Sequence, residues 1–332
     1  MDRYTKETKK WLEQRFRQVG NREIYFAHQP IYGFRKGPTE SGLIDKYVCT
    51  YQILKALSHL DFNSLLDVGG AEGYKAYVVN KILGAKVESS DLSEEACQKA
   101  REIFKIKSKP ADIHNLPYKD NEFDVVLCSE TLEHIADNKK GIKELLRVAE
   151  RAVVITVPHE SKKTIEKNIK EEVAHSHIHH FNLKSFDFLK ESFGYCIFKE
   201  KMVSSILRIP MILADAKKRK YYPGARYPKV LIDVYNVLVP LLAKIFGERT
   251  VSLIIKLDEF ICRFSPFYYY ILFVILKDRK YYLKEEIKKI SPSEILNISV
   301  PFYYLNKKDN ELSPGLNYNT ELERLERHCK MP

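Results

Sequence analysis

The segment LLDVGGAEGY at residues 65–74 constrains the fold more than any other part of the chain. An apolar run, expected to form a buried strand, leads directly into a glycine-rich turn and then into a helix. Glycine adopts backbone dihedral angles that other residues avoid, and it lets a ligand approach bare N–H groups. Taken alone, this turn is compatible with a nucleoside site, a dinucleotide site or a purely structural bend.

Around this turn, short apolar runs alternate with helical segments, which is the pattern of a parallel sheet with crossover helices. Runs such as DVVLC and VVITV are continuously apolar, as expected for strands buried on both faces. The sequence predicts strands at residues 64–68, 86–90, just before Asp112, 123–129, 152–157, 195–203 and 267–277, and helices at 74–83, 93–104 and 138–149. The predicted fold is an α/β, Rossmann-like, seven-stranded sheet with helices on both faces.

The rest of the chain adds an N-terminal helical extension and a helical insertion before the last strand. The predicted parts are residues 1–60, an N-terminal helical cap; 61–204, the core; 205–264, the helical insertion; 265–278, the last strand of the core; and 279–332, a polar tail. The insertion includes the basic run KKRKYYPGARYPK and two segments with apolar residues at helical spacing. Because the strand after it is needed to complete the sheet, we expect the insertion to belong to the same domain.

Charge and hydropathy restrict the partners and the location. The net charge of +11 favours an anionic partner such as nucleic acid, a phosphorylated compound or an acidic lipid surface. No stretch reaches the roughly 20 apolar residues that cross a bilayer, and the first residues lack the apolar segment of a secretory signal. We therefore expect a cytoplasmic location, with peripheral contact at the inner membrane face as an alternative.

Acidic side chains stand at the ends of three successive predicted strands, at Asp67, Asp91 and Asp112. The carboxyl ends of parallel strands meet at one edge of the sheet, and ligands of open α/β sheets bind outside that edge. Asp91 follows the second strand, where a carboxylate can accept hydrogen bonds from ribose hydroxyls. The three acids predict a site for a polar, cationic, nucleoside-like ligand.

Residues 62–195 resemble the class I S-adenosylmethionine-dependent methyltransferases, in particular the small-molecule group with a type 11-like domain. The glycine motif of that family corresponds to DVGGAEG, its ribose-binding acid lies in VESSDLSEEA, and its adenine-side acid lies in ADIHNLPY. The segment LPYKDNEFDVVLCSETLEHIADNKKGIKELLRV follows the family pattern nearly position by position. A hydride-transferring Rossmann enzyme is disfavoured, because the third glycine spacing of GxGxxG is not met.

The chain departs from the family pattern at two places. Ala71 replaces the middle glycine of the turn, so we expect the affinity for the cofactor to be adjusted but not lost. The segment AERAV replaces the paired glycines that usually precede the fifth strand, which suggests a different local turn.

The resemblance implies S-adenosyl-L-methionine as cofactor and assigns residues to its parts. The implied residues are Asp67, Gly69, Gly70 and Gly73 around the amino-acid part, Asp91 at the ribose, Leu92 against the adenine face, Asp112 and the backbone of Ile113 at the adenine edge, and Ser129 in the passage between methyl donor and acceptor.

Methyl transfer from a sulfonium needs mainly alignment and a dry site, so a general base is optional. His134 in SETLEHI is the candidate base, with packing or helix capping as its alternative role. The segment HSHIHHF at 175–181 predicts a loop that faces the acceptor, and the candidate acceptor-side residues are Glu130, His177 and His180. No cysteine or paired acid stands beside these histidines in the sequence, so no metal is expected.

The expected activity is methyl transfer to an O or N atom of a small-molecule, glycan or lipid-linked acceptor. The insertion would cap the site, pair two subunits as a homodimer, or rest on an anionic membrane surface. An RNA methyltransferase, which the positive charge favours, and a non-catalytic binding protein with the same fold are the alternatives. Nucleic acid is the less favoured partner, because no RNA-binding module is recognisable in the sequence.

Overall fold

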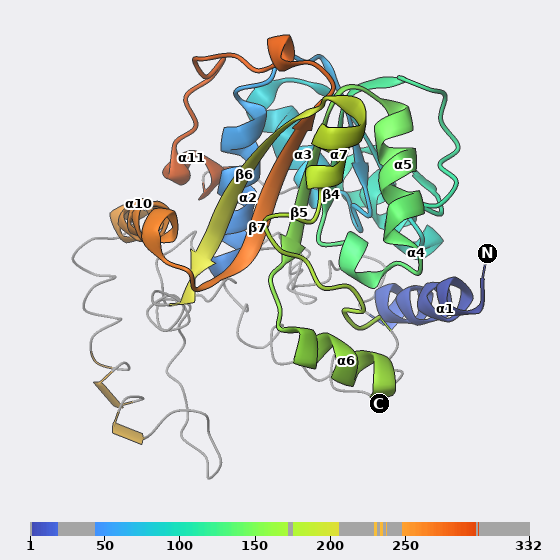
Figure 1. Ribbon diagram of the computed structural model, residues 1–332, viewed down its shortest axis with the longest axis horizontal. Helices are drawn as coiled ribbons and strands as arrows, with labels where there is room; N and C mark the ends of the chain where they lie inside the picture. The colour runs from blue at the N-terminus through green and yellow to red at the C-terminus, as the bar shows by residue number, and fades with distance from the viewer. Residues whose placement is uncertain are drawn as a thin grey trace, which may run out of the picture.

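The computed structural model describes residues 2–18, 44–171, 175–205, 229–230, 233–234, 237, 248–296 and 298. One seven-stranded sheet forms its centre, in the order β3-β2-β1-β4-β5-β7-β6 (Figure 1). The strands are β1 Ser64–Val68, β2 Lys86–Asp91, β3 Lys107–Pro110, β4 Phe123–Ser129, β5 Ala149–Pro158, β6 Cys196–Ser204 and β7 Tyr268–Leu276. Strands β1 to β5 pair in parallel, and β7 pairs antiparallel with both β5 and β6. The predicted Rossmann-like α/β sheet is confirmed.

The strand order places a ligand crevice at the carboxyl ends of β1 and β4. These two strands are neighbours, but the chain continues from β1 toward β2 on one side and from β4 toward β5 on the other. Loops that leave the two strands therefore diverge, and open α/β sheets bind ligands at such a switch point. Asp67 pairs in register with Ser89 on one side and with Leu127 on the other, so the strand ends are level.

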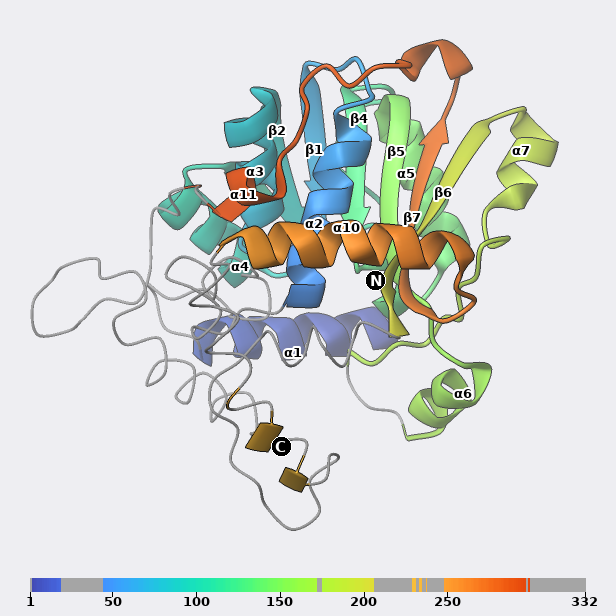
Figure 2. The same cartoon turned by 90° about the vertical axis from the view of Figure 1, so that its left-hand side faces the viewer.

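Helices cover both faces of the sheet, because alternate residues of each buried strand point to opposite faces. On β4, Val125 and Leu127 join the core under one set of helices, whereas Val126 and Cys128 join the core under the other. The first face is covered by α2 Ile44–Leu57, α3 Tyr74–Leu83, α10 Glu248–Phe264 and α11 Pro292–Leu296, and the second by α5 Asn138–Val148 and α7 Asp187–Phe193 (Figure 2).

The remaining elements lie near the carboxyl edge and at the periphery. They are α1 Arg3–Gln18, α4 Glu94–Lys99 continued by a π-helical turn Ala100–Phe104, α6 Lys162–Glu171, and 3₁₀ turns at Leu132–His134 and Arg279–Tyr281.

Two local expectations differ from the structure. The helix expected over residues 93–104 is a short α-helix followed by a π-helical turn. The segment AERAV forms the first half of β5, which begins at Ala149 directly after α5, with a register shift against β4 between Phe123 and Val125. The irregular pairing replaces the separate turn that the sequence suggested.

The last strand completes the sheet as expected, because β7 lies between β5 and β6. Of the predicted insertion, the structure describes α10 and a few isolated positions; the basic run, except Lys229, and most of the first apolar segment lie outside the described residues. Residue 297 and residues 299–332 of the predicted polar tail also lie outside them. Within the described part of the chain, no helix combines the length and the hydropathy that a membrane span requires.

Candidate active site

The loop between β1 and α3 turns sharply at the carboxyl edge. The backbone N–H groups of Gly69 and Gly70 both donate to the carbonyl oxygen of Ser90, at 2.8 and 3.0 Å. Gly69 has a φ of +72°, in the left-handed region that favours glycine. A Cβ on Gly70 would lie 2.4 Å from Ser89 Oγ and 2.7 Å from Asp67 Oδ2. The loop therefore requires glycine at one position for its dihedral angle and at the other for space.

Asp91 ties this loop to the end of β2. Its Oδ2 accepts a hydrogen bond from the Ala71 N–H, and its Oδ1 accepts one from the Ser93 N–H, both at 2.9 Å. Ala71 has a φ of +48°, where a residue with a Cβ costs about 1–2 kcal/mol relative to right-handed backbone. The bond to a buried carboxylate offsets this cost, so the loop keeps its shape without the family's middle glycine.

A first pocket opens beside Asp91. The space between its lining atoms, including the part open to solvent, is about 730 Å³, within the range of roughly 300–1,000 Å³ typical of small-molecule sites. Its walls come from the loop after β1, the end of β2, the loop after β3, the loop after β4 and the helix α1. The sequence-predicted residues that line it are Gly69, Asp91, Leu92, Asp112, Ile113, Glu130 and His134.

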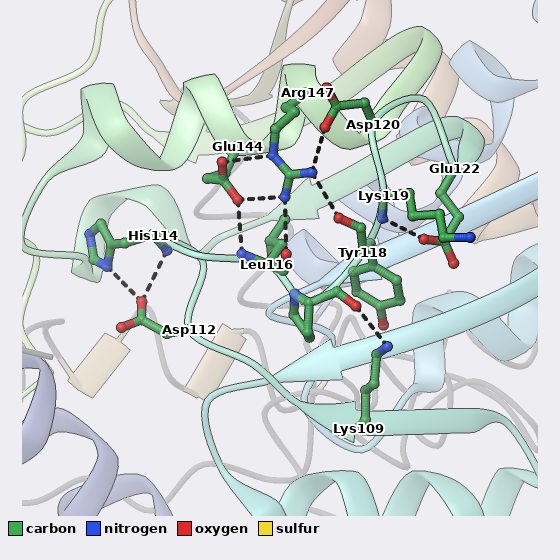
Figure 3. Close-up of polar contacts among 11 residues, drawn as sticks. Lys109, Asp112, His114, Leu116, Tyr118, Lys119, Asp120, Glu122, Glu144 and Arg147 are labelled. Atoms are coloured by element: carbon green, nitrogen blue, oxygen red, sulfur yellow. Dashed lines mark hydrogen bonds and ion pairs between the residues drawn. The ribbon is translucent and has the colours of Figure 1, made fainter.

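Asp112 is oriented by His114, a residue that the sequence reasoning did not single out. Asp112 Oδ1 accepts hydrogen bonds from the backbone N–H of His114 at 3.0 Å and from its Nδ1 at 2.7 Å (Figure 3). The N–H of Asp137 donates to His114 Nε2 at 3.1 Å. Because Nε2 accepts, Nδ1 carries the ring proton. These contacts use Oδ1 of Asp112 and leave Oδ2 to accept a hydrogen bond from a ligand.

The loop that carries Asp112 is pinned by Arg147 on α5. Its guanidinium binds both carboxylate oxygens of Glu144, at 2.9 and 2.8 Å, and donates to the carbonyl oxygens of Leu116 and Tyr118 at 3.0 and 2.8 Å (Figure 3). Glu144 in turn accepts from the Leu116 N–H at 2.9 Å. The hydrogen bonds from Arg147 lower the pKa of Glu144. Paired charged groups of this kind fix the position of the loop.

Helix α1 forms one wall of the first pocket. Its Glu13 caps the start of α4: the carboxylate accepts from Ser93 Oγ at 3.1 Å and from the N–H groups of Glu94 and Glu95 at 2.8 and 3.2 Å. Arg17 adds an ion pair with Glu95 at 2.7 Å. Acidic groups at a helix N-terminus are stabilising, so these contacts dock α1 on the core. The residues of α1 in the pocket wall are Tyr4, Thr5, Thr8, Leu12 and Phe16.

A second pocket adjoins the first and contains most of the ionisable groups. The two pockets share Gly69, Ala71, Glu130, His134 and His175. The second pocket also has Gly70, Ser129, Lys46, Lys75, Glu133 and His177 in its wall. Ser129 ends β4, with its hydroxyl oxygen 2.6 Å from Thr156 Oγ1. Ser129, which the sequence predicts in the passage between methyl donor and acceptor, thus lines the second pocket but not the first.

Two acids of this region interact electrostatically with lysines. Glu130, which has a φ of +55°, forms an ion pair with Lys46. Asp67 lies beneath the glycine loop, only 1% exposed, and is not part of either pocket wall. Burial raises the pKa of Asp67 to about 6, and the charge of Lys75 opposes that rise. Asp67 therefore shapes the loop from below.

Glu133 and His134 lie side by side in the second pocket. Glu133 is 1% exposed, and burial raises its pKa to about 7. Its Oε2 is buried and has no hydrogen-bond partner among the described residues. Burial also lowers the pKa of His134 well below its usual value. His134 Nδ1 lies 3.2 Å from the carbonyl oxygen of Ser176, and its ring stacks on His175 with centroids 3.8 Å apart.

The two other predicted acceptor-side histidines differ in position. His177 lines the second pocket, and its Nδ1 lies 3.0 Å from Glu160 Oε2. Burial lowers the pKa of His177, but the contact with Glu160 and the charge of Glu133 outweigh burial and raise it. His180 is not part of either pocket wall. Its Nδ1 lies 2.8 Å from the Glu160 carbonyl oxygen.

Gly73 serves packing instead of lining a pocket. It has a φ of +79°, and a Cβ there would lie 3.0 Å from the Cβ of Ala100. Its role in the structure is to let α3 start close to the π-helical turn.

The sheet order, the glycine loop and the acids at the carboxyl edge agree with a class I, Rossmann-like S-adenosylmethionine-dependent methyltransferase domain. A family model described as "Methyltransferase domain" matches residues 66–157, and the chain carries this domain, whose cofactor is S-adenosylmethionine.

Curated relatives agree with this class over part of their length. The chain is 35% identical to norajmaline N-methyltransferase of Rauvolfia serpentina over 101 residues, covering 28% of this chain and 35% of that protein. It is 32% identical to chloroplastic tocopherol O-methyltransferase of Arabidopsis thaliana over 106 residues, covering 29% of this chain and 30% of that protein. The matched region thus spans about a third of each relative's length.

A solved structure of Haemonchus contortus phosphoethanolamine N-methyltransferase 2 in complex with S-adenosyl-L-methionine matches at 16% identity and a TM-score of 0.43, covering 71% of this chain and 57% of that chain.

Proposed function

We propose that the protein transfers the methyl group of S-adenosylmethionine to an O or N atom of a small-molecule, glycan or lipid-linked acceptor. The observation that carries this proposal is the pair of adjoining pockets at the carboxyl edge. Asp91 and Asp112 line the first pocket. Glu130 and His134 line both pockets, at the place where they adjoin. The names of the relatives, an N-methyltransferase and an O-methyltransferase, support both types of acceptor atom.

We assign the adenosine part of the cofactor to the first pocket. The Asp91 carboxylate lies at the end of β2 and lines this pocket, where a carboxylate can accept hydrogen bonds from ribose hydroxyls. Leu92 supplies an apolar surface for the adenine face, and Asp112 Oδ2 accepts from the adenine amino group beside the Ile113 backbone. The glycine loop and Ser129 then hold the amino-acid part and the reacting end near the second pocket.

When bound, S-adenosylmethionine supplies an electrophilic methyl group, and the residues of this chain supply position and exclusion of water. Holding the acceptor atom and the methyl group in line is worth on the order of 7–11 kcal/mol. Helix α1 covers the adenosine side and keeps water from it. We place His134 on the acceptor side: its Nδ1 is directed to the Ser176 carbonyl oxygen, which leaves Nε2 without a proton.

The described part of the insertion supports a lipid-linked acceptor. Helix α10 exposes a stripe of large apolar side chains at helical spacing, at Leu253, Leu257, Phe260 and Phe264. Exposed apolar patches of soluble proteins mark interaction surfaces. We propose that this stripe meets the apolar part of the acceptor or the anionic membrane that carries it.

Calorimetry with S-adenosylmethionine tests the cofactor assignment. The unmodified protein is expected to bind one equivalent, and Asp91→Ala to lose at least 100-fold in affinity, because the ribose contact and the loop anchor are removed together. Asp61→Ala is the matched control: Asp61 precedes β1 at the opposite end of the strand and is 68% exposed. No binding by the unmodified protein, or equal affinities of the two variants, would contradict the proposal.

Methyl transfer itself is measured with methyl-labelled cofactor and fractionated cell extract. Label is expected in a fraction of small molecules, glycans or lipids, and it should disappear with Asp91→Ala and persist with Asp61→Ala. Label recovered in RNA would overturn the proposed acceptor class while keeping the methyltransferase activity.

A further inference from the structure

Three side chains in the second pocket have the arrangement of a metal site. Glu133, His134 and His177 each offer one ligand atom, and these atoms lie within 4.8 Å of one another. Glu133 Oε1 and His134 Nε2 are 4.0 Å apart. Ligands at about 2.0–2.2 Å from one ion lie roughly 3–4.5 Å from each other. The cluster therefore needs only a small contraction to close around a cation.

Both histidines are held in the way that metal-ligating histidines usually are, with the second ring nitrogen fixed by a carbonyl or a carboxylate. His134 Nδ1 lies 3.2 Å from the Ser176 carbonyl oxygen, and His177 Nδ1 lies 3.0 Å from Glu160 Oε2. In the tautomer that these contacts favour, Nδ1 carries the proton. In each ring, Nε2 is left as the atom that can ligate.

Glu133 supplies the third ligand and needs a positive partner. It is 1% exposed, and its Oε2 has no hydrogen-bond partner among the described residues. A buried carboxylate oxygen in this condition is costly unless a cation or a proton meets it. The positive charges of the pocket act on Glu133 only in part, since Lys46 pairs with Glu130 and Lys75 is attracted more strongly to Asp67 than to Glu133.

We propose that Glu133, His134 and His177 bind a divalent transition-metal cation such as Zn²⁺, with its open positions toward the second pocket. Two imidazole nitrogens and one carboxylate oxygen are an established ligand set for catalytic zinc and for other open metal sites. The sequence expectation of no metal rested on the lack of a paired acid beside residues 175–181. In the fold, Glu133 is that acid, because the loops after β4 and β5 meet at the pocket.

The ion has a chemical use that rests on the proposed function. A hydroxyl of the acceptor that binds the cation has a lowered pKa and gives its proton to solvent at neutral pH. Its oxygen then forms a bond with the methyl carbon while the bond from that carbon to sulfur breaks, which yields a methyl ether and S-adenosylhomocysteine. The metal site thus favours an oxygen acceptor. Binding of the metal is independent of this step and can be tested without it.

Calorimetry with Zn²⁺ alone, on the full chain without a histidine tag and without S-adenosylmethionine, tests the site. We expect one Zn²⁺ per chain with a dissociation constant of about 1 µM or tighter. Glu133→Gln and His177→Gln keep the approximate side-chain size and should each weaken binding about tenfold or more, as loss of a ligand exceeds the effect of losing a supporting contact. Binding of Co²⁺ followed by its visible absorption gives an independent measurement.

The matched control is His179→Gln. His179 belongs to the same loop, but its Nε2 bonds to the Ile135 carbonyl oxygen at 2.6 Å, so Zn²⁺ affinity should stay within about twofold. Near-ultraviolet circular dichroism of each variant without metal verifies folding. Glu160→Gln should weaken binding less than Glu133→Gln, because Glu160 only positions His177.

Unchanged Zn²⁺ affinity in folded Glu133→Gln and His177→Gln, or an equal loss in His179→Gln, overturns the metal site. Absence of Zn²⁺ binding together with intact S-adenosylmethionine binding would refute the metal site and leave the proposed function standing. Absence of S-adenosylmethionine binding together with intact Zn²⁺ binding would refute the proposed function and leave the metal site standing.

Discussion

Replacing Asp67 with asparagine in the cofactor-free protein should change how stability depends on pH. Burial raises the pKa of Asp67 from its usual 3.8 to about 6, net of the attraction to Lys75 and the repulsion from Asp91. Between these values the folded protein holds a proton that the unfolded chain has released, so the free energy of unfolding falls as pH rises. Each pKa unit is worth about 1.4 kcal/mol, which gives about 3 kcal/mol in all, and about 2.4 kcal/mol of this is lost between pH 4 and pH 7.

Urea denaturation of the unmodified protein and Asp67→Asn from pH 4 to pH 8 measures this loss. Asparagine cannot ionise, so the stability of the variant relative to the unmodified protein should rise by about 2.4 kcal/mol from pH 4 to pH 7 and then level off. The measured quantity is a change with pH, so a constant effect of the substitution cancels.

Asp124→Asn is the control with the opposite sign. Burial raises the pKa of Asp124, but hydrogen bonds from the N–H groups of Asn63 and Ser64, at 2.7 and 2.9 Å, outweigh burial and lower it. This carboxylate stabilises the fold at neutral pH and loses its effect as pH falls below about 4. A stability difference for Asp67→Asn that is constant from pH 4 to pH 8 would refute the reasoning about burial.

Three further substitutions test the loop, the helix α1 and the adenine side. Gly70→Ala should lower stability by about 1–3 kcal/mol because its Cβ overlaps Ser89, and thermal melting will detect the loss. Glu13→Gln should weaken S-adenosylmethionine binding about fivefold, or ~1 kcal/mol, because the charge at the α4 N-terminus is lost; Glu7→Gln, on the same helix, should leave calorimetric affinity unchanged. His114→Leu should weaken cofactor binding about tenfold while the melting temperature changes little, since it removes the donor that orients Asp112.

The sheet and the glycine loop could be predicted because their pattern is local in the sequence. A buried strand must be continuously apolar, and the glycine turn follows it directly, so β1, β4 and the loop after β1 were placed within a residue or two. The acids at the ends of β1, β2 and β3 could be recognised because they recur at strand ends. Even there, the structure separates Asp67, which lies beneath the loop, from Asp91 and Asp112, which line the first pocket.

The acceptor side could not be predicted to the same depth, because its contacts join segments far apart in the chain. Glu133 and His177 meet in the second pocket through two different loops, and no spacing rule connects them. His114 acts through Asp112 and the N–H of Asp137, which only the folded loop brings together. The apolar residues of α1 predicted a helix, but not which surface it would cover.

The position of α1 has a practical consequence for anyone who produces the protein. The helix begins at Arg3, is capped by Asp2 through the N–H of Thr5 at 2.9 Å, and contributes Tyr4 to the wall of the first pocket. An expression tag or fusion partner attached ahead of Asp2 therefore emerges beside the first pocket. Tags of this kind are expected to alter the apparent affinity and the exchange rate of the cofactor, so a reporter is better attached elsewhere on the chain.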